Sequence, residues 1–411
     1  MTEAPLEMSP DGWHRHHLSL ARFVYDLVAG ELKLLRRGGG HLPPPPWSAD
    51  TPVGEDGLGL DSLERMEVAS ALSEALHLHE SGVEDLLLAR RTLGEWVDVA
   101  SRGLAHFDSR LSFRTSGSSG EPKSCIHSLA DLAQEIDHLA DLFRGAKRIL
   151  SAVPAHHIYG FLFTVLLPER LGRLEVVDVR LLTPRTLARQ LQAGDVVISH
   201  PTHWSLVARD GGPLPRGVTG VTSTAPCPVE LAAALSRSEG GLDRFVQVYG
   251  SSETAGVGWR ESPGMPFQLM PHWSRSPAGQ LEMRRRADNG DMCTAMTQDV
   301  IEWLGDRHFH VAGRLDTAVQ VGGINVFPKR VSAMLSTHPQ VREAAVRLMT
   351  PSEGHRLKAF VVPEAGADTE ALRAELDQWA NTHLDAPERP KSYTFGTQLP
   401  VNENGKYRDW T

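Results

Sequence analysis

At 411 residues, the chain is long enough for two or three domains. Its formal net charge of −9 gives no general reason to expect nucleic acid or an anionic membrane as a partner, and no run of about 20 apolar residues predicts a membrane-spanning segment. Cys125, Cys227 and Cys293 lie far apart without a CxxC pair, which argues against a zinc site or a disulfide framework and favours a reducing, cytoplasmic location.

Residues 1–104 are predicted to be helical. The stretch 17–37 has the apolar spacing of a helix, and a Pro-rich loop follows three glycines at 38–40. A second helix is predicted to begin after Asp61, which can form a capping box with Glu64, and a last helix is predicted to begin at Thr92. The buried stripe expected on the second helix consists of Leu63, Met66, Ala69, Leu72 and Leu76.

The stretch TSGSSGEPKS, residues 115–124, surrounds Gly117 and Gly120 with hydroxyl side chains and contains Lys123. Glycine lets the backbone approach a ligand closely, and successive backbone N–H groups in such a turn bind anions. Lysine occurs at only seven positions of this chain, so its presence here is informative. The predicted occupant of the loop is a phosphate group, and the alternative is a solvated Ser/Gly linker.

From residue 110 to 254, strand-like segments such as DVVISH and RFVQVYG alternate with helical ones. This alternation predicts a parallel sheet with helices on both faces, and ligands in such sheets bind beyond the carboxyl ends of the strands. Four polar loops are expected to converge at that edge: 115–123, 155–160, 223–226 and 249–253. Short β segments follow to about residue 316, and the rest of the chain predicts a small α+β piece.

Six motifs occur in order within residues 110–411: TSGSSGEPK, YGSSE, TQD, GRLD, VGGINVFP and LPVNENGKYR. In order and spacing they resemble those of the adenylate-forming enzymes, which include acyl-CoA synthetases and the adenylation domains of peptide synthetases. Within the family, HHIYGFLFTVLLP and VYGSSETAGVGWRESPGMPFQLMP are most similar to the AMP-ligases of aryl polyene and xanthomonadin pigment clusters.

The resemblance implies an α/β adenylation core over residues 110–316 and a mobile C-terminal subdomain over 317–411, with Asp316 as the hinge. It also implies a reaction in which a carboxylate attacks the α-phosphorus of ATP to give an acyl-adenylate and pyrophosphate. Because negative charge gathers in that transition state, the site needs positioning and cations such as Mg²⁺.

Residue by residue, the resemblance assigns catalysis to Lys406, Glu253 and Thr115, with Lys406 bridging the carboxylate and the α-phosphate and Glu253 binding Mg²⁺. His157 would line the acyl pocket, although it could equally be a plain loop residue. The nucleotide would be bound by residues of the phosphate loop, the adenine-binding loops and the ribose site: Thr115, Ser116, Gly117, Ser118, Ser119, Gly120 and Lys123; Ser223, Thr224, Ala225, Tyr249, Gly250, Ser251 and Ser252; Asp299 and Arg314.

A second resemblance concerns residues 58–76, LGLDSLERMEVASALSEAL, which are similar to the prosthetic-group site of acyl carrier proteins. It implies that Ser62 carries 4′-phosphopantetheine and that residues 1–104 form a carrier-like four-helix bundle. The acidic surface around this segment would then serve a phosphopantetheinyl transferase and downstream acyl-processing enzymes, whereas charge runs are ordinarily solvated faces.

These expectations combine into a carrier fused to a reduced adenylation enzyme, which loads a carboxylic acid, aryl acids among the candidates, onto its own pantetheine arm. Ligation to free CoA or to a separate carrier is one alternative, and a non-catalytic scaffold is another. Two departures from the family stand out. The usual N-terminal lobe is missing, so that a partner, a homodimer or a reduced pocket would replace it, and Gln298 stands where the family has glycine before Asp299.

Overall fold

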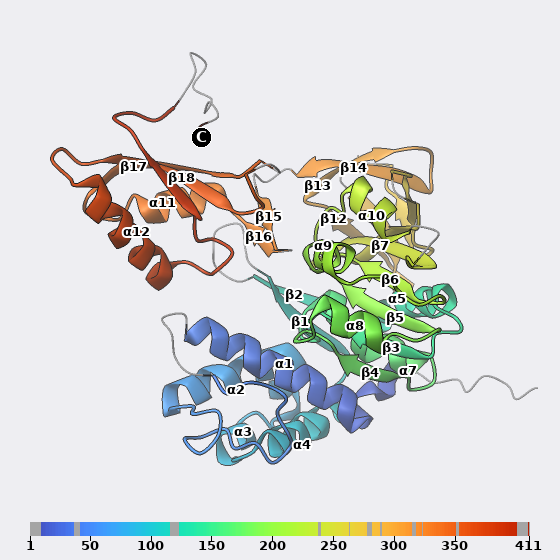
Figure 1. The fold of residues 1–411 in the computed structure, drawn as a ribbon. Helices are drawn as coiled ribbons and strands as arrows, with labels where there is room; N and C mark the ends of the chain where they lie inside the picture. The colour runs from blue at the N-terminus through green and yellow to red at the C-terminus, as the bar shows by residue number, and fades with distance from the viewer. Residues whose placement is uncertain are drawn as a thin grey trace, which may run out of the picture. The chain divides into compact units, whose positions relative to one another are not determined.

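The computed structural model describes residues 10–36, 42–115, 123–236, 240–262, 264–277, 282–287, 290–314, 318–322, 324–350, 353–400 and 410. They form two compact units (Figure 1). The larger unit takes in the described residues of 1–33, 42–115 and 124–313, and the smaller takes in those of 34–41, 116–123 and 314–411. Each unit has its own hydrophobic core and is described separately. Across the described ranges, no helix combines the length and apolar character needed to cross a membrane.

The N-terminal helices of the larger unit lie where helices were expected. They are η1 (Pro10–Arg15), α1 (His17–Leu35), α2 (Ser62–Leu76), η2 (Leu78–Ser81), α3 (Leu86–Ala89) and α4 (Leu93–Leu104). Capping boxes begin α2 and α4. The Asp61 carboxylate accepts from Glu64 N at 2.8 Å, and Thr92 pairs in the same way with Glu95. The local sequence therefore starts these helices at the predicted residues.

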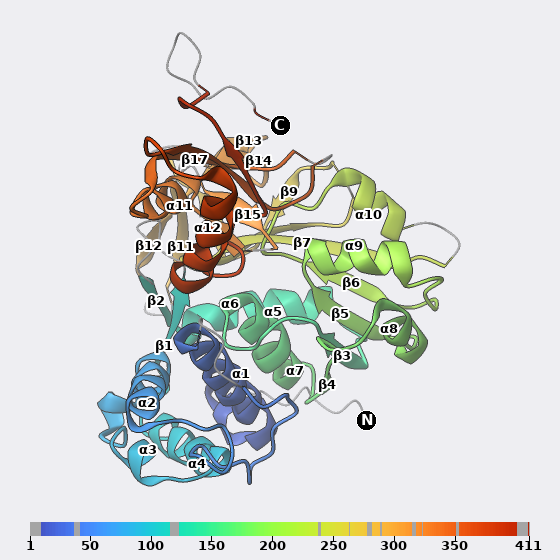
Figure 2. The same cartoon turned by 60° about the vertical axis from the view of Figure 1, so that its left-hand side comes forward.

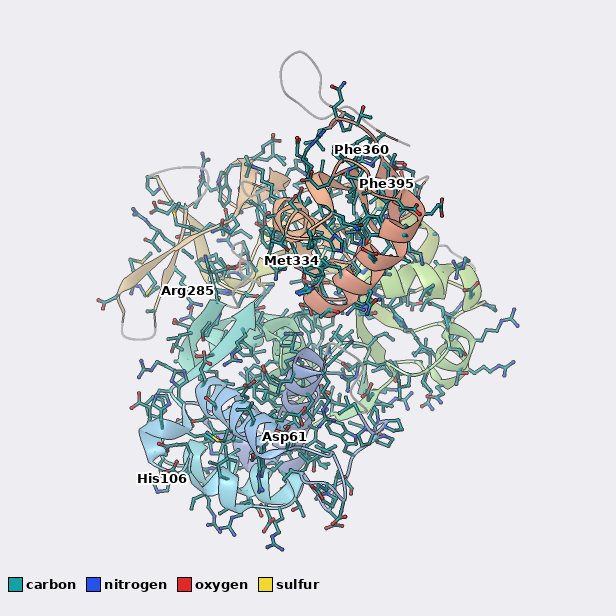
Figure 3. The ribbon with its side chains drawn as sticks, turned by 90° about the vertical axis from the view of Figure 1, so that its left-hand side faces the viewer. Asp61, His106, Arg285, Met334, Phe360 and Phe395 are labelled. Atoms are coloured by element: carbon teal, nitrogen blue, oxygen red, sulfur yellow. The ribbon has the colours of Figure 1, made fainter. Side chains whose placement is uncertain are left out.

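The predicted buried stripe of α2 is correct only in its second half. Ala69, Leu72 and Leu76 are buried, whereas the side chains of Leu63 and Met66 are 64 % and 57 % exposed. The reason is that α2 packs into the core from Val68 onward, while its first turn lies at the surface of the unit, where Asp61 is labelled in Figure 3.

The α/β part contains a nine-stranded sheet in the order β13-β14-β9-β8-β7-β6-β5-β3-β4. The pairs β4–β3, β3–β5, β5–β6 and β6–β7 are parallel, as predicted, and the pairs β7–β8, β8–β9 and β9–β14 are antiparallel. The strands are β3 (Arg148–Ser151), β4 (Glu175–Asp178), β5 (Asp195–Ser199), β6 (Thr219–Thr222), β7 (Arg244–Ser251), β8 (Ala255–Arg260), β9 (Phe267–Leu269), β13 (Asp299–Trp303) and β14 (His308–Arg314).

Helices cover both faces of this sheet (Figures 1 and 2). Along β5, Val196 and Ile198 belong to one apolar cluster and Val197 to another, as the two-residue repeat of a strand requires. The helices are α5 (Leu129–Leu142), α6 (Ile158–Phe161), the π-helical η3 (Leu162–Leu166), α7 (Leu167–Arg170), α8 (Pro184–Gln190), α9 (Pro201–Asp210) and α10 (Val229–Leu235). Two smaller sheets complete the unit: β1 (Arg110–Thr115) with β2 (Lys123–Ser128), and β10 (Trp273–Arg275), β11 (Glu282–Arg286) and β12 (Met292–Met296).

One continuous apolar core joins the N-terminal helices to the α/β sheet. Phe161 of α6 lies 5.1 Å from Trp13, 5.6 Å from Phe23 and 5.4 Å from Phe113, measured between ring centroids. The same core extends from these rings to residues of α2 and α4 on one side and to β5, β6 and β7 on the other. The helices of residues 1–104 thus share one core and one unit with the sheet, and the carrier-like four-helix bundle expected there is not confirmed.

The smaller unit confirms the α+β piece expected at the C-terminus. Its three-stranded sheet β17 (Val341–Leu348), β18 (Leu357–Pro363) and β19 (Ser392–Phe395) carries α11 (Pro328–Leu335) and α12 (Thr369–His383), beside the hairpin β15 (Val319–Val321) and β16 (Ile324–Val326). Trp410 packs edge-on against Phe360. The Arg347 guanidinium lies over the Trp410 ring and donates to the Trp410 carbonyl oxygen at 2.9 Å. Phe360 and Phe395 are labelled in Figure 3.

Candidate active site

The loop after β7 holds Glu253 at its exposed tip. A tight turn shapes this loop, because Ser251 N donates to Thr254 Oγ1 at 3.1 Å and Thr254 N donates to Ser251 Oγ at 3.3 Å. Gly250 fits because a Cβ at that position would lie 2.2 Å from the Ala255 carbonyl oxygen. The loop thus presents one carboxylate to solvent from a backbone that is fixed by local hydrogen bonds.

Tyr249 and Asp299 are 50 residues apart in the chain but meet in the structure. The Tyr249 hydroxyl donates to Asp299 Oδ2 at 2.9 Å, and Thr297 Oγ1 donates to the Asp299 carbonyl oxygen at 2.7 Å. The Asp299 side chain is nearly buried at the start of β13, and the Tyr249 ring packs against Phe309. The side chains of Tyr249 and Thr297 thus hold Asp299 in place directly after Gln298.

The loop predicted to contact adenine follows β6, which neighbours β7 in the sheet. Thr224 is exposed and left-handed at φ 74°, and Ser223 and Ala225 on either side of it are partly exposed. Because β6 and β7 are parallel, their carboxyl ends open onto the same edge. The fold brings residues 223–225 and 249–253 to that edge, as the sequence predicted.

The segment AHHIYG lies after β3 and begins α6. His157 is the residue before α6, and its imidazole lies against that of His156, with 4.1 Å between ring centroids and 42° between the ring planes. The buried Tyr159 hydroxyl donates to Ser199 O at 3.0 Å, which fastens the segment to the end of β5. His157 is therefore placed at the strand edge, although its role in an acyl pocket stays a prediction.

Two buried side chains that sequence reasoning missed support the Glu253 loop from behind. His127 Nε2 lies 2.6 Å from Ser252 O, and Glu135 Oε2 accepts from Gly256 N at 2.8 Å. Burial raises the pKa of Glu135 to about 7, against the opposing influence of the Gly256 hydrogen bond and Arg285. The available signal was a carboxylate between Leu132 and Leu139 on the apolar side of a predicted amphipathic helix.

Several predicted residues cannot be placed in this site. Ser116, Gly117, Ser118, Ser119, Gly120, Asp316 and Lys406 lie outside the described residues, as do the side chains of Thr115 and Arg314. Lys123 begins β2 with an exposed side chain. Ser62 is exposed as the first residue of α2, directly after the capping residue Asp61. Their predicted roles stay predictions.

Comparison with known proteins agrees with this geometry. The profile of the family described as "AMP-binding enzyme" matches residues 108–284, and that of "AMP-binding enzyme C-terminal domain" matches residues 330–406. Among curated relatives, a "4-coumarate--CoA ligase" of Halorhodospira halophila is 37 % identical over 94 % of this chain and 97 % of its own length. One of Rhodobacter capsulatus with the same name is 38 % identical over 95 % of this chain and 99 % of its own.

Solved structures share the fold. The amide bond synthetase McbA from Marinactinospora thermotolerans aligns with a TM-score of 0.58 at 24 % identity, over 73 % of this chain and 68 % of its own. A malonyl-CoA ligase aligns with a TM-score of 0.57 at 22 % identity, over 71 % of each chain. The matches to the two 4-coumarate–CoA ligases span almost the whole sequence. The chain belongs to the AMP-binding, adenylate-forming enzyme family.

Proposed function

We propose that the protein is an AMP-forming acid–thiol ligase that converts an aryl carboxylic acid to its CoA thioester. The observation that carries the proposal is the match, over nearly the full length of both chains, to ligases named for 4-coumarate and CoA. The pairing of Tyr249 with Asp299 beside the Glu253 loop supports it, because the hydrogen bond fixes the carboxylate proposed to bind the ribose.

The reaction follows in two balanced steps. A carboxylate oxygen of the acid attacks the α-phosphorus of ATP, and pyrophosphate leaves with the electron pair of the broken P–O bond. The CoA thiol, on losing its proton, then attacks the carbonyl carbon of the adenylate, and AMP leaves. Both steps pass through transition states rich in negative charge, so fixed donors and cations supply most of the stabilisation.

Within this scheme the chain's residues have separate tasks. Glu253 offers a hard oxygen ligand at an exposed loop tip, which fits Mg²⁺, an ion that takes few carboxylates and keeps waters. Asp299 accepts the ribose hydroxyls, with Tyr249 fixing the carboxylate through its hydroxyl. Lys406 is proposed to meet the carboxylate and the α-phosphate in the first step alone.

The test measures pyrophosphate release with ATP, Mg²⁺ and a panel of acids that includes 4-coumarate, followed by mass spectrometry of the CoA product. We expect an aryl acid to be turned over to acyl-CoA. Asp299→Asn should raise the KM for ATP at least tenfold, and Tyr249→Phe should raise it several-fold, since one hydrogen bond to a charged group contributes about 1.5–3 kcal/mol. Release of pyrophosphate that does not depend on any acid, or no release at all, would contradict the proposal.

The second candidate is transfer to a pantetheine arm on Ser62, and the observation that favours it is the exposed position of this serine beside the exposed Leu63 and Met66. In this version a phosphopantetheinyl transferase modifies Ser62, and the loaded arm serves downstream acyl-processing enzymes of the pigment type. Incubation with CoA and a transferase, read by intact-protein mass spectrometry, decides between the two. A mass gain that is lost in Ser62→Ala supports the carrier, and no gain leaves CoA as the acceptor.

A further inference from the structure

One face of α1 carries four residues that contact the segment between β3 and β4. They are Ser19, Arg22, Asp26 and Gly30. At 100° per residue, these positions fall within about 80° of one another around the helix. Their contacts run along the helix axis in order, from Glu169 of α7 through Thr164 of η3 to Ala155 and His156 at the start of the AHHIYG segment. Figure 2 shows α1 lying alongside α6 and α7.

Asp26 is the centre of this stripe and is almost fully buried. Its Oδ2 accepts from Ala155 N at 2.7 Å, and its Oδ1 lies 2.7 Å from Nη2 of Arg180, which follows β4. A buried carboxylate is costly unless it is paired and hydrogen-bonded, and Asp26 is both. Its two bonds connect α1 to the two chain segments that leave β3 and β4 at their carboxyl ends.

Gly30 lies one turn further along α1, against His156. A Cβ at Gly30 would lie 2.7 Å from His156 Nε2, so any larger residue there would push the imidazole. On the other side of the ring, His156 Nδ1 is buried and has no hydrogen-bond partner among the residues described. Burial also holds the pKa of His156 well below its ordinary value, so the ring is neutral near pH 7. A buried, unpaired ring nitrogen is costly unless a ligand or water bonds to it.

Arg22 fixes the next part of the segment. Its Nη1 donates to Thr164 O at 2.6 Å, and Thr164 Oγ1 donates to Gly160 O at 2.7 Å. Thr164 belongs to the π-helical η3, a geometry that is frequent at functional sites. The Arg22 side chain therefore ties this π-helical turn to the N-terminal helix.

We propose that α1 forms the supporting wall of the acid-binding pocket, with Asp26 and Gly30 as positioning residues that set where His156 and His157 stand. This inference rests on the proposed function, and it names α1 as what replaces the missing lobe of the larger family members. The specificity for the acid is then encoded partly in residues 22–30, far from the family motifs in the sequence.

The test compares Asp26→Asn and Gly30→Ala with Ser19→Ala in the full-length protein. Ser19→Ala is the matched control, because it removes the 2.6 Å bond to Glu169 Oε1 at the opposite end of the same helix face. Asp26→Asn keeps an acceptor for Ala155 N but loses the charge facing Arg180. We expect both test variants to raise the KM for 4-coumarate, or the best acid of the panel, at least fivefold, with the KM for ATP changed less than twofold. Ser19→Ala should change neither constant.

A readout without turnover separates this proposal from the proposed function. The NMR resonances of the imidazole Cε1–H groups of His156 and His157 are assigned from variants that each lack one of these histidines. They should shift in Asp26→Asn and Gly30→Ala and stay unchanged in Ser19→Ala. Unshifted resonances, or KM values that change equally for acid and ATP, would overturn the role of α1. If the wild-type protein activates no acid while the histidine resonances still shift in Asp26→Asn and Gly30→Ala, the proposed function is overturned and α1 is only a structural support.

Discussion

Glu135 is a carboxyl group that lies, nearly fully buried, directly behind the loop of Glu253. Its single described hydrogen bond comes from Gly256 N. Among the described residues, Arg285 is the cation that lowers its pKa, and Arg285 is itself paired with Asp131 at 2.5 Å. Desolvation therefore dominates and raises the pKa of Glu135 to about 7. A residue that is neutral below pH 7 and charged above it thus supports the loop proposed to bind Mg²⁺.

This position predicts a pH-dependent stability. Because the pKa of Glu135 is about 7 in the folded state against 4.5 in the unfolded state, the folded state holds the extra proton between these values. Stability is therefore greatest below pH 4.5 as far as this group is concerned, and it falls as the pH rises to 7, by about 3 kcal/mol in order of magnitude. Glu135→Gln keeps an acceptor for Gly256 N and never ionises, so it should match the wild type at pH 5 and exceed it at pH 8.

Urea unfolding followed by circular dichroism at pH 5, 6, 7 and 8 measures the difference between the two proteins. The difference in the free energy of unfolding should grow with pH and level off above 7. Parallel pH profiles would show that Glu135 is ionised in the folded state throughout, and that Arg285 or water compensates for its burial.

At the scale of single elements, α2 separates a structural residue from a proposed functional one. Asp61 caps the helix, accepting from Glu64 N, while the Ser62 side chain is exposed and makes no hydrogen bond to the residues that the structure describes. Asp61→Ala should lower the free energy of unfolding by about 1 kcal/mol, the usual effect of losing an N-cap, whereas Ser62→Ala should change it by less than about 0.5 kcal/mol.

Thermal unfolding of the two variants side by side checks this contrast. It also validates the carrier test, since a Ser62→Ala protein that is folded like the wild type can be used for mass spectrometry without further control. A destabilisation by Ser62→Ala as large as that by Asp61→Ala would mean that the serine has a structural role in α2.

The sequence predicted those elements that are set by a local pattern of residues. Capping boxes and the alternation of strands with helices are local, and they predicted α2, α4 and the parallel strands β3, β5, β6 and β7. Burial of Leu63 and Met66 was wrong because helical spacing marks an apolar face but not where the neighbouring elements begin to cover it. The bonds of Asp26 to Ala155 and of Tyr249 to Asp299 join residues 129 and 50 positions apart, which no local pattern reveals.

At the scale of the whole molecule, the N-terminal helices and the sheet of the larger unit depend on each other. Trp13 and Phe23 pack on Phe161, and His77 Nε2 lies 2.9 Å from Ser112 Oγ within the same buried interior. The family members that match this chain over 94 % or more of its length share this N-terminal region, since residues 1–104 exceed the part left unaligned.

This dependence predicts that residues 105–411 alone will not form the larger unit. Removing residues 1–104 would expose Phe161, Phe113 and the apolar side of α5–α7. It would also delete the Asp26 carboxylate that accepts from Ala155 N and the Arg22 guanidinium that donates to Thr164 O. At about 25 cal/mol per Å² of apolar surface, losing several fully covered aromatic rings exceeds the 5–15 kcal/mol by which domains are ordinarily stable. The truncated chain should therefore be insoluble or bind a hydrophobic dye, with no cooperative melting of the larger unit.

Residues 314–411 provide the matched control, because they have their own core and should melt cooperatively when expressed separately. A soluble 105–411 fragment that melts cooperatively and still exchanges pyrophosphate would show instead that residues 1–104 are a detachable domain, as a carrier would be.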